Sequence, residues 1–181
     1  ILYVNFGSEF PLLGTLEAIL IESTKRATKE IPLRPNTVDP VVHKNPGDNT
    51  GSHMPWINWT LTKGPDLQIT VFPKGGGSEN VCRLGMLTPG KGILGTKQFV
   101  IDSVIDAGAN PCPPTVVGVG IGGGADICLK LAKETLLRPM GERSSNPEIA
   151  KLEEELLAAI NRTGIGPMGL GGDTTALDVH V

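Results

Sequence analysis

The sequence predicts an α/β fold: a mixed β-sheet flanked by helices, in a single domain over residues 1–181. Segments with apolar residues at helical spacing alternate along the chain with short runs of β-branched and aromatic residues. A length of 181 residues fits one domain that buries roughly 70% of the surface of its unfolded chain. Both ends are expected to be truncated, because residues 1–4 and 177–181 read as unfinished strands.

Composition excludes several classes of protein. The net charge is −3 and no basic cluster occurs, so neither nucleic acid nor an anionic membrane is an expected partner. No apolar run reaches the ~20 residues of a membrane span, and no leader opens the chain. The three cysteines are too few and too scattered for a disulfide scaffold. A soluble, cytoplasmic protein with reduced thiols is expected.

The first third of the chain predicts a strand, a helix and a stiff loop. After the strand at residues 1–4, helical spacing runs from Leu12 to about Glu30. Residues 31–40 contain three prolines, which exclude both a helix and a paired strand. Arg34 lies in this extended loop. The residues leave two readings open: a solvated loop arginine, or an anchor that grips a carboxylate in bidentate fashion.

A β-hairpin and a glycine-rich loop are expected next. Residues 56–62 and 67–72 read as strands joined by the turn at 63–66. The second strand leads into Gly75, Gly76 and Gly77, whose backbone amides could bind an anion. The same loop could be a flexible connector, since it lacks the spacing of a Walker phosphate-binding loop.

The second half reads as helices alternating with two strands. The expected helices cover residues 91–107, 125–137 and 147–161, and the strands cover residues 115–119 and 177–181. Gly108 is placed to end the first of these helices, and Asn146 to cap the last. Glu153, Glu154 and Glu155 are expected on a solvated helix face. All the strands, those of the hairpin included, are expected to join one mixed sheet.

Cys112 stands in the most distinctive stretch of the chain. Pro111, Pro113 and Pro114 surround it and exclude a helix or a central strand, so the cysteine should lie on a stiff loop. The strand behind it runs into a G-x-G-x-x-G pattern that begins at Gly118. Dinucleotide binding is disfavoured, because another helix follows where that fold needs a second strand ending in an acidic residue.

Four motifs, at residues 74–80, 110–114, 118–123 and 164–172, together resemble the iron–sulfur hydro-lyases: class I fumarase and L(+)-tartrate dehydratase, alpha subunit or N-terminal domain. Residues 33–40 and 48–51 are closer to the tartrate dehydratase type. The resemblance implies reversible elimination of water from a hydroxy-dicarboxylate, either malate to fumarate or L-tartrate to oxaloacetate. It also implies a beta subunit or C-terminal domain as partner, and an oligomer.

The resemblance also assigns site residues. It implies that Cys112 is one thiolate ligand of a [4Fe–4S] cluster whose other cysteines lie before Ile1 and beyond Val181. Arg34 and the loop of Gly75, Gly76, Gly77 and Ser78 would clamp the dicarboxylate, and Cys112, Gly76 and Ser78 are expected to converge on one cavity with Arg34 at its rim.

Other residues receive no such role. Cys82 and Cys128 are expected to be buried or bystander thiols. No catalytic base is assigned, because neither His43 nor His180 matches the family histidine. The 181-residue chain alone is expected to lack the cluster and to be inactive. The competing hypothesis is a metal-free module that binds a small carboxylate or a nucleotide through its glycine-rich loops.

Overall fold

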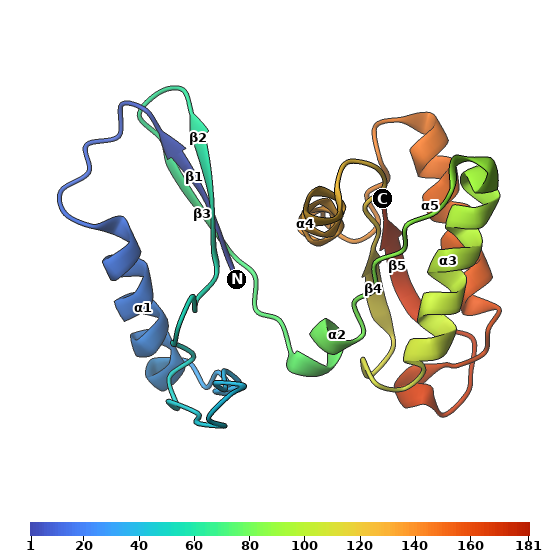
Figure 1. Cartoon of the computed structure of the whole chain (residues 1–181), viewed down its shortest axis with the longest axis horizontal. Helices are drawn as coiled ribbons and strands as arrows, with labels where there is room; N and C mark the ends of the chain where they lie inside the picture. The colour runs from blue at the N-terminus through green and yellow to red at the C-terminus, as the bar shows by residue number, and fades with distance from the viewer. The chain divides into compact units, whose positions relative to one another are not determined.

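The computed structural model describes all of residues 1–181, which form two compact units, Ile1–Gly76 and Gly77–Val181 (Figure 1). Each unit combines strands with helices, and parallel and antiparallel strand pairs both occur, so the predicted α/β class with a mixed sheet is confirmed. The expectation that all strands join one sheet is wrong. The strands form a three-stranded sheet in the first unit and a two-stranded sheet in the second.

The first unit contains strands β1 (Leu2–Gly7), β2 (Ile57–Thr62) and β3 (Leu67–Val71), and helix α1 (Leu16–Glu30). The sheet order is β2-β1-β3, with β1 parallel to β2 and antiparallel to β3. The predicted hairpin is therefore wrong in its pairing, although both of its strands exist, because β1 lies between them.

The connection from β2 to β3 crosses the end of β1 at Gly7, and it packs directly against the backbone of that residue. The backbone N–H of Gly7 donates to the carbonyl oxygen of Asp66 at 2.8 Å. A Cβ on Gly7 would lie 2.3 Å from the carbonyl oxygen of Gly64, which is a steric clash. Glycine at this position lets the connection close over the strand.

Leu2 and Val4 of β1 pack against Leu16 and Leu20 of α1 to form the core of the first unit. The helix begins at Leu16, one turn later than its apolar spacing predicted. Gly14 has a φ of +93°, a left-handed conformation that cannot continue a right-handed helix, so the chain before it stays outside α1.

The second unit is built on the parallel pair β4 (Thr115–Gly118) and β5 (Ala176–His180). Figure 1 shows α4 (Ala125–Thr135) on one side of this pair, and α3 (Gly92–Ala107) and α5 (Pro147–Asn161) on the other. All five elements lie where the sequence predicted them, with no end shifted by more than two residues. Gly108 ends α3, and the Asn146 side chain caps α5 by accepting from the backbone N–H of Glu148 at 2.9 Å.

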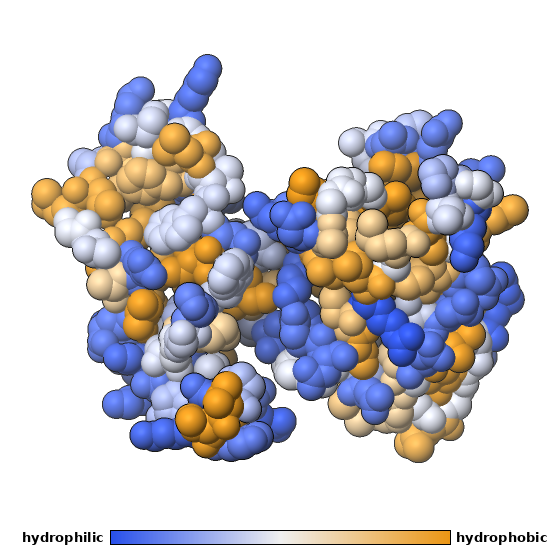
Figure 2. All heavy atoms as spheres, in the orientation of Figure 1, coloured by the Kyte–Doolittle hydropathy of each residue, from blue (hydrophilic) through white to orange (hydrophobic).

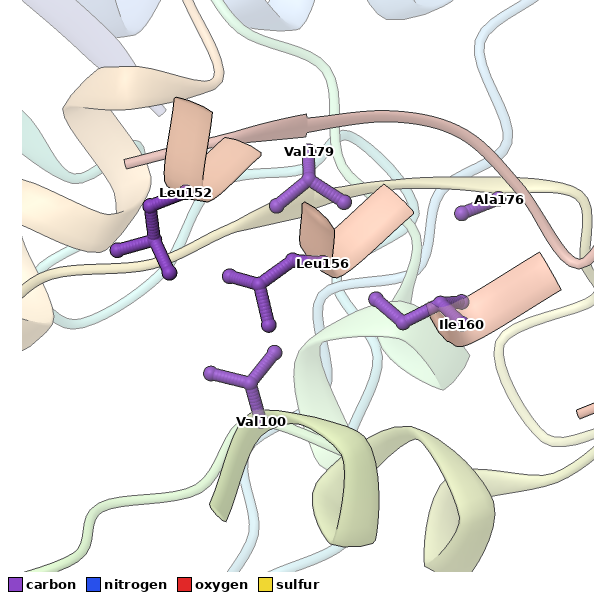
Figure 3. Close-up of a cluster of buried hydrophobic side chains, with 6 residues drawn as sticks. All are labelled: Val100, Leu152, Leu156, Ile160, Ala176 and Val179. Atoms are coloured by element: carbon purple, nitrogen blue, oxygen red, sulfur yellow. The ribbon is translucent and has the colours of Figure 1, made fainter. Parts of the chain in front are cut away.

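The main core of the second unit lies between β5, α5 and α3 (Figure 3). It consists of the buried side chains of Val100, Leu152, Leu156, Ile160, Ala176 and Val179. Leu156 and Ile160 are almost completely inaccessible, so this apolar contact fixes α5 against the strand.

Three short elements complete the fold. They are α2 (Gly76–Asn80), which the sequence did not predict, and the 3₁₀ turns Pro89–Lys91 and Pro167–Gly169. Glycine has a low helix propensity, which is why the start of α2 read as loop. None of the helices combines the length and the apolar character that crossing a membrane requires.

Candidate functional site

Cys112 lies on an exposed loop between α3 and β4, as the surrounding prolines predicted. Its φ is +56°, a left-handed conformation that residues with a Cβ rarely adopt. The loop is nevertheless ordered by turn hydrogen bonds. The backbone N–H of Cys112 donates to the carbonyl oxygen of Ala109 at 2.9 Å, and that of Asn110 donates to Ala107 at 3.0 Å. The thiol is therefore presented to solvent from a defined backbone.

Gly77 lies beside this loop in the second unit. A Cβ on Gly77 would be 3.0 Å from the carbonyl oxygen of Asn110, two residues before Cys112. An ion pair between Glu79 and Lys133 links α2 to α4. Of the residues predicted to bind substrate, Gly77 is thus brought next to the cysteine loop, and Ser78 follows it in α2.

Arg34 lies in the first unit, on an exposed loop. The Asn49 side chain braces this loop twice: its Nδ2 donates to the carbonyl oxygen of Arg34 at 3.2 Å, and its Oδ1 accepts from the backbone N–H of Asn36 at 2.9 Å. Asn45 Nδ2 donates to the carbonyl oxygen of Pro35 at 2.8 Å. The turn at residues 45–51 therefore holds the Arg34 backbone in place.

The predicted substrate residues are divided between the two units. Arg34, Gly75 and Gly76 belong to the first, whereas Gly77, Ser78 and Cys112 belong to the second. Because these residues belong to separate units, their convergence on one cavity stays a prediction.

The other two thiols are also free. Cys82 is exposed rather than buried, and Cys128 is half-buried in α4, where its Sγ lies 3.5 Å from the carbonyl oxygen of Ala125. No group of three or more His, Cys, Asp or Glu side chains is arranged to hold a metal ion. A metal centre that used Cys112 would therefore need its remaining ligands from outside these residues.

Glu153 is buried, so the expectation that it lies on a solvated helix face is wrong. Its side chain is 0% exposed, whereas it was expected on a solvated face with Glu154 and Glu155. It forms an ion pair with Arg138 and accepts hydrogen bonds from the backbone N–H groups of Val181 at 2.9 Å and Ser144 at 3.0 Å. Burial alone would raise the pKa of Glu153, but these donors together lower it.

Asp178 and His180 extend this buried polar cluster along β5. Burial would raise the pKa of Asp178, yet hydrogen bonds from the Gly141 N–H, Arg143, the Val179 N–H and His180 lower it to about 2. The ring of His180 is fully buried, with Nε2 3.0 Å from Asp178 Oδ2 and Nδ1 3.0 Å from the carbonyl oxygen of Thr135. His180 is thus a structural residue without access to a substrate.

A groove of about 810 Å³ lies beyond the C-terminal ends of β4 and β5. Its walls are mostly apolar, with the Lys97–Glu155 ion pair among its lining residues. Cys112 precedes β4 and is not part of the lining, so the groove and the cysteine loop lie at opposite ends of that strand. Sequence reasoning missed this groove, because its lining comes from three helices and from the residues after both strands.

Comparison with known proteins gives one family. The family described as Fumarate hydratase (Fumerase) matches residues 1–181. A protein from Methanocaldococcus jannaschii named "Putative L(+)-tartrate dehydratase subunit alpha" is 54% identical over 162 residues, which cover 88% of this chain and 57% of that protein. The L(+)-tartrate dehydratase subunit alpha of Escherichia coli strain UTI89 is 41% identical over 180 residues, or 99% of this chain and 59% of that protein. The chain thus spans less than three fifths of the length of these relatives.

Proposed function

Because the chain belongs to the fumarate hydratase family, we propose that it is the alpha component of a [4Fe–4S]-dependent hydro-lyase. Membership of the family supports a hydro-lyase. The proposed reaction is reversible elimination of water from a hydroxy-dicarboxylate, with malate/fumarate and L-tartrate/oxaloacetate as the candidate pairs. The names of the relatives favour L-tartrate.

The geometry of Cys112 is the observation that carries this proposal. A cysteine that ligates a metal has to be free of a disulfide and is best placed on an ordered backbone, and Cys112 meets both conditions. When bound, a cluster with one iron free of protein ligands supplies a Lewis acid toward the departing hydroxyl group. Cys112 would ligate one iron of the cluster, and the other thiolate ligands would come from outside residues 1–181.

The substrate carboxylates need cationic and N–H donors. Arg34 offers a planar guanidinium suited to bidentate binding, on a loop braced by Asn45 and Asn49. The backbone amides of Gly75, Gly76, Gly77 and Ser78 are the proposed second clamp. Orienting both carboxylates would fix which C–O bond breaks. The general base is not among the residues proposed.

The complete enzyme is proposed to need a second component. The relatives are named alpha subunits and extend well beyond the matched region, which favours a beta subunit or further domain that completes the site. An oligomer in the cytoplasm is the proposed working form.

Iron binding and activity test the proposal together. The full-length protein, prepared without oxygen and with its partner, should show thiolate-to-iron absorption and dehydratase activity. In Cys112→Ser both should be lost, while the far-UV circular dichroism stays unchanged because an exposed loop residue carries little packing.

Cys82→Ser is the matched control, since Cys82 is also exposed, and it should keep its iron and its activity. An active, iron-bearing Cys112→Ser variant would refute the proposal. A wild-type protein that binds dicarboxylates without iron would favour the metal-free binding module instead.

A further inference from the structure

We propose that the glycine-rich loop at residues 164–172 is a positioning element for Cys112. In this inference, the loop holds the cysteine backbone in its left-handed conformation and so sets the reactivity of the thiol. Only the use of that thiol as a cluster ligand rests on the proposed function.

The loop contacts the cysteine segment on both sides of Cys112. The backbone N–H of Met168 donates to the carbonyl oxygen of Pro113 at 2.7 Å, and Pro113 is fully buried. On the other side, Gly169 lies against Ala109: a Cβ on Gly169 would be 2.4 Å from the Cβ of Ala109. Ala109 also accepts the hydrogen bond from the Cys112 N–H, at 2.9 Å. The two contacts therefore bracket the cysteine.

The glycine-rich loop is itself closed and anchored. The Gly171 N–H donates to the carbonyl oxygen of Ile165 at 2.8 Å, and the Gly166 N–H donates to the buried hydroxyl of Thr175 at 3.1 Å. A Cβ on Gly166 would lie 2.1 Å from the carbonyl carbon of Gly171, so the two arms of the loop touch. A loop held in this way is rigid enough to fix the conformation of the segment around Cys112.

Two residues at the contact have strained backbone conformations that the surrounding structure has to hold. Cys112 has a φ of +56° and Met168 a φ of +57°, and neither residue is glycine. Residues with a Cβ keep this conformation only where the surroundings hold it. If the contact were displaced, the Cys112 backbone would relax and its thiol would sample other directions.

Gly169→Ala tests the contact, with Gly164→Ala as the matched control. Both glycines are left-handed, with φ of +75° and +68°, so both substitutions carry the same kind of backbone strain. A Cβ at Gly164 meets nothing within 4 Å, whereas one at Gly169 collides with Ala109. Only Gly169→Ala should therefore displace the cysteine loop.

The readout is the alkylation rate of each cysteine by iodoacetamide, followed by peptide mass spectrometry on the 181-residue chain. The rate at Cys112 should rise at least threefold in Gly169→Ala and stay at the wild-type value in Gly164→Ala, with Cys82 as an unchanged internal reference. An unchanged or slower rate at Cys112 in folded Gly169→Ala would overturn the inference.

A second variant keeps the test decisive if Gly169→Ala does not fold. Ala109→Gly deletes the same contact without a clash, and should raise the Cys112 rate in the same direction by a smaller factor; no change would count against the inference. Iron content of the full-length variants separates the two proposals. If the alkylation rate of Cys112 responds but the iron content never depends on Cys112, the positioning role stands and the cluster assignment fails. If the iron content depends on Cys112 but its alkylation rate does not respond, the cluster assignment stands and the positioning role fails.

Discussion

Glu153 has an environment opposite to that of its neighbour Glu154, which is exposed on the same helix. The difference follows from helical geometry, because successive residues on a helix point about 100° apart. Glu153 precedes Leu156 by three residues and Ile160 by seven, so it lies on the same face of the helix as these core residues. Its carboxylate meets Arg138 and two backbone N–H groups there.

Glu153→Gln is expected to destabilise the second unit by about 3 kcal/mol, because it leaves Arg138 without its counter-charge and places an amide against backbone donors. Urea unfolding followed by circular dichroism at 222 nm measures this. Trp56 and Trp59 both lie in the first unit, so the transition seen by tryptophan fluorescence should not move.

Glu154→Gln is the control for the same chemical change at an exposed position, and its effect should stay within about 0.5 kcal/mol. Equal losses of stability in both variants would show that the buried cluster contributes nothing specific.

At the residue scale, loop residues were easier to predict than buried charges. The exposed loop position of Cys112 followed from its prolines, which act locally on φ. The burial of Glu153, Asp178 and His180 did not follow, because it depends on partners up to 45 residues away in sequence. The helical spacing of Glu153 from the neighbouring apolar residues indicated that it is buried. The two adjacent glutamates instead suggested a continuous solvated face.

At the element scale, the sequence identified the strands and the longer helices but not every strand pairing. The turn at residues 63–66 correctly separated β2 from β3, and a short turn normally joins paired strands. β1 lies between them instead, and residues more than 50 positions away supply that pairing. The same limit applied to the candidate site. The sequence identified its local segments, but it does not show how those segments are arranged in space.

Gly118 at the end of β4 and Gly120 just after it have a packing role that their resemblance to a dinucleotide motif concealed. A Cβ on Gly118 would lie 2.1 Å from the carbonyl oxygen of Ala132, and one on Gly120 would lie 2.0 Å from that of Cys128. Both oxygens belong to α4. The missing side chains therefore allow the helix backbone to lie directly against the strand and the residues that follow it.

Gly120→Ala is expected to destabilise the second unit by about 3 kcal/mol or more, since the clash is with backbone atoms that cannot rotate away. The measurement is again urea unfolding at 222 nm. Gly122→Ala is the comparison: Gly122 has a φ of +86° with nothing within 4 Å of its Cβ position, so only the backbone cost of about 1 kcal/mol applies. Similar losses in the two variants would contradict the close-packing interpretation.

At the scale of the whole molecule, the first unit has a sheet face that one helix covers only in part. Leu2 and Val4 of the central strand pack under α1. Trp59 and Ile69 both pair with Val4, so they lie on the same face, yet they are 47% and 40% exposed. Leu61 of β2 and Val71 of β3 are on this face as well, at 74% and 66%. Figure 2 shows exposed apolar side chains on this unit, as on the second.

Exposed apolar surface of this kind is typical of a face that binds another protein segment. The 181-residue chain is therefore expected to enhance the fluorescence of the uncharged apolar dye Nile red in its folded state. Leu61→Lys should lower that signal by at least half, because it places a charge on the exposed apolar face. Thr60→Lys adds the same charge to the same strand on the opposite, polar face, and should leave the signal nearly unchanged. If both lysine variants lowered dye binding equally, the partly covered face of the sheet would not be the binding surface of the dye.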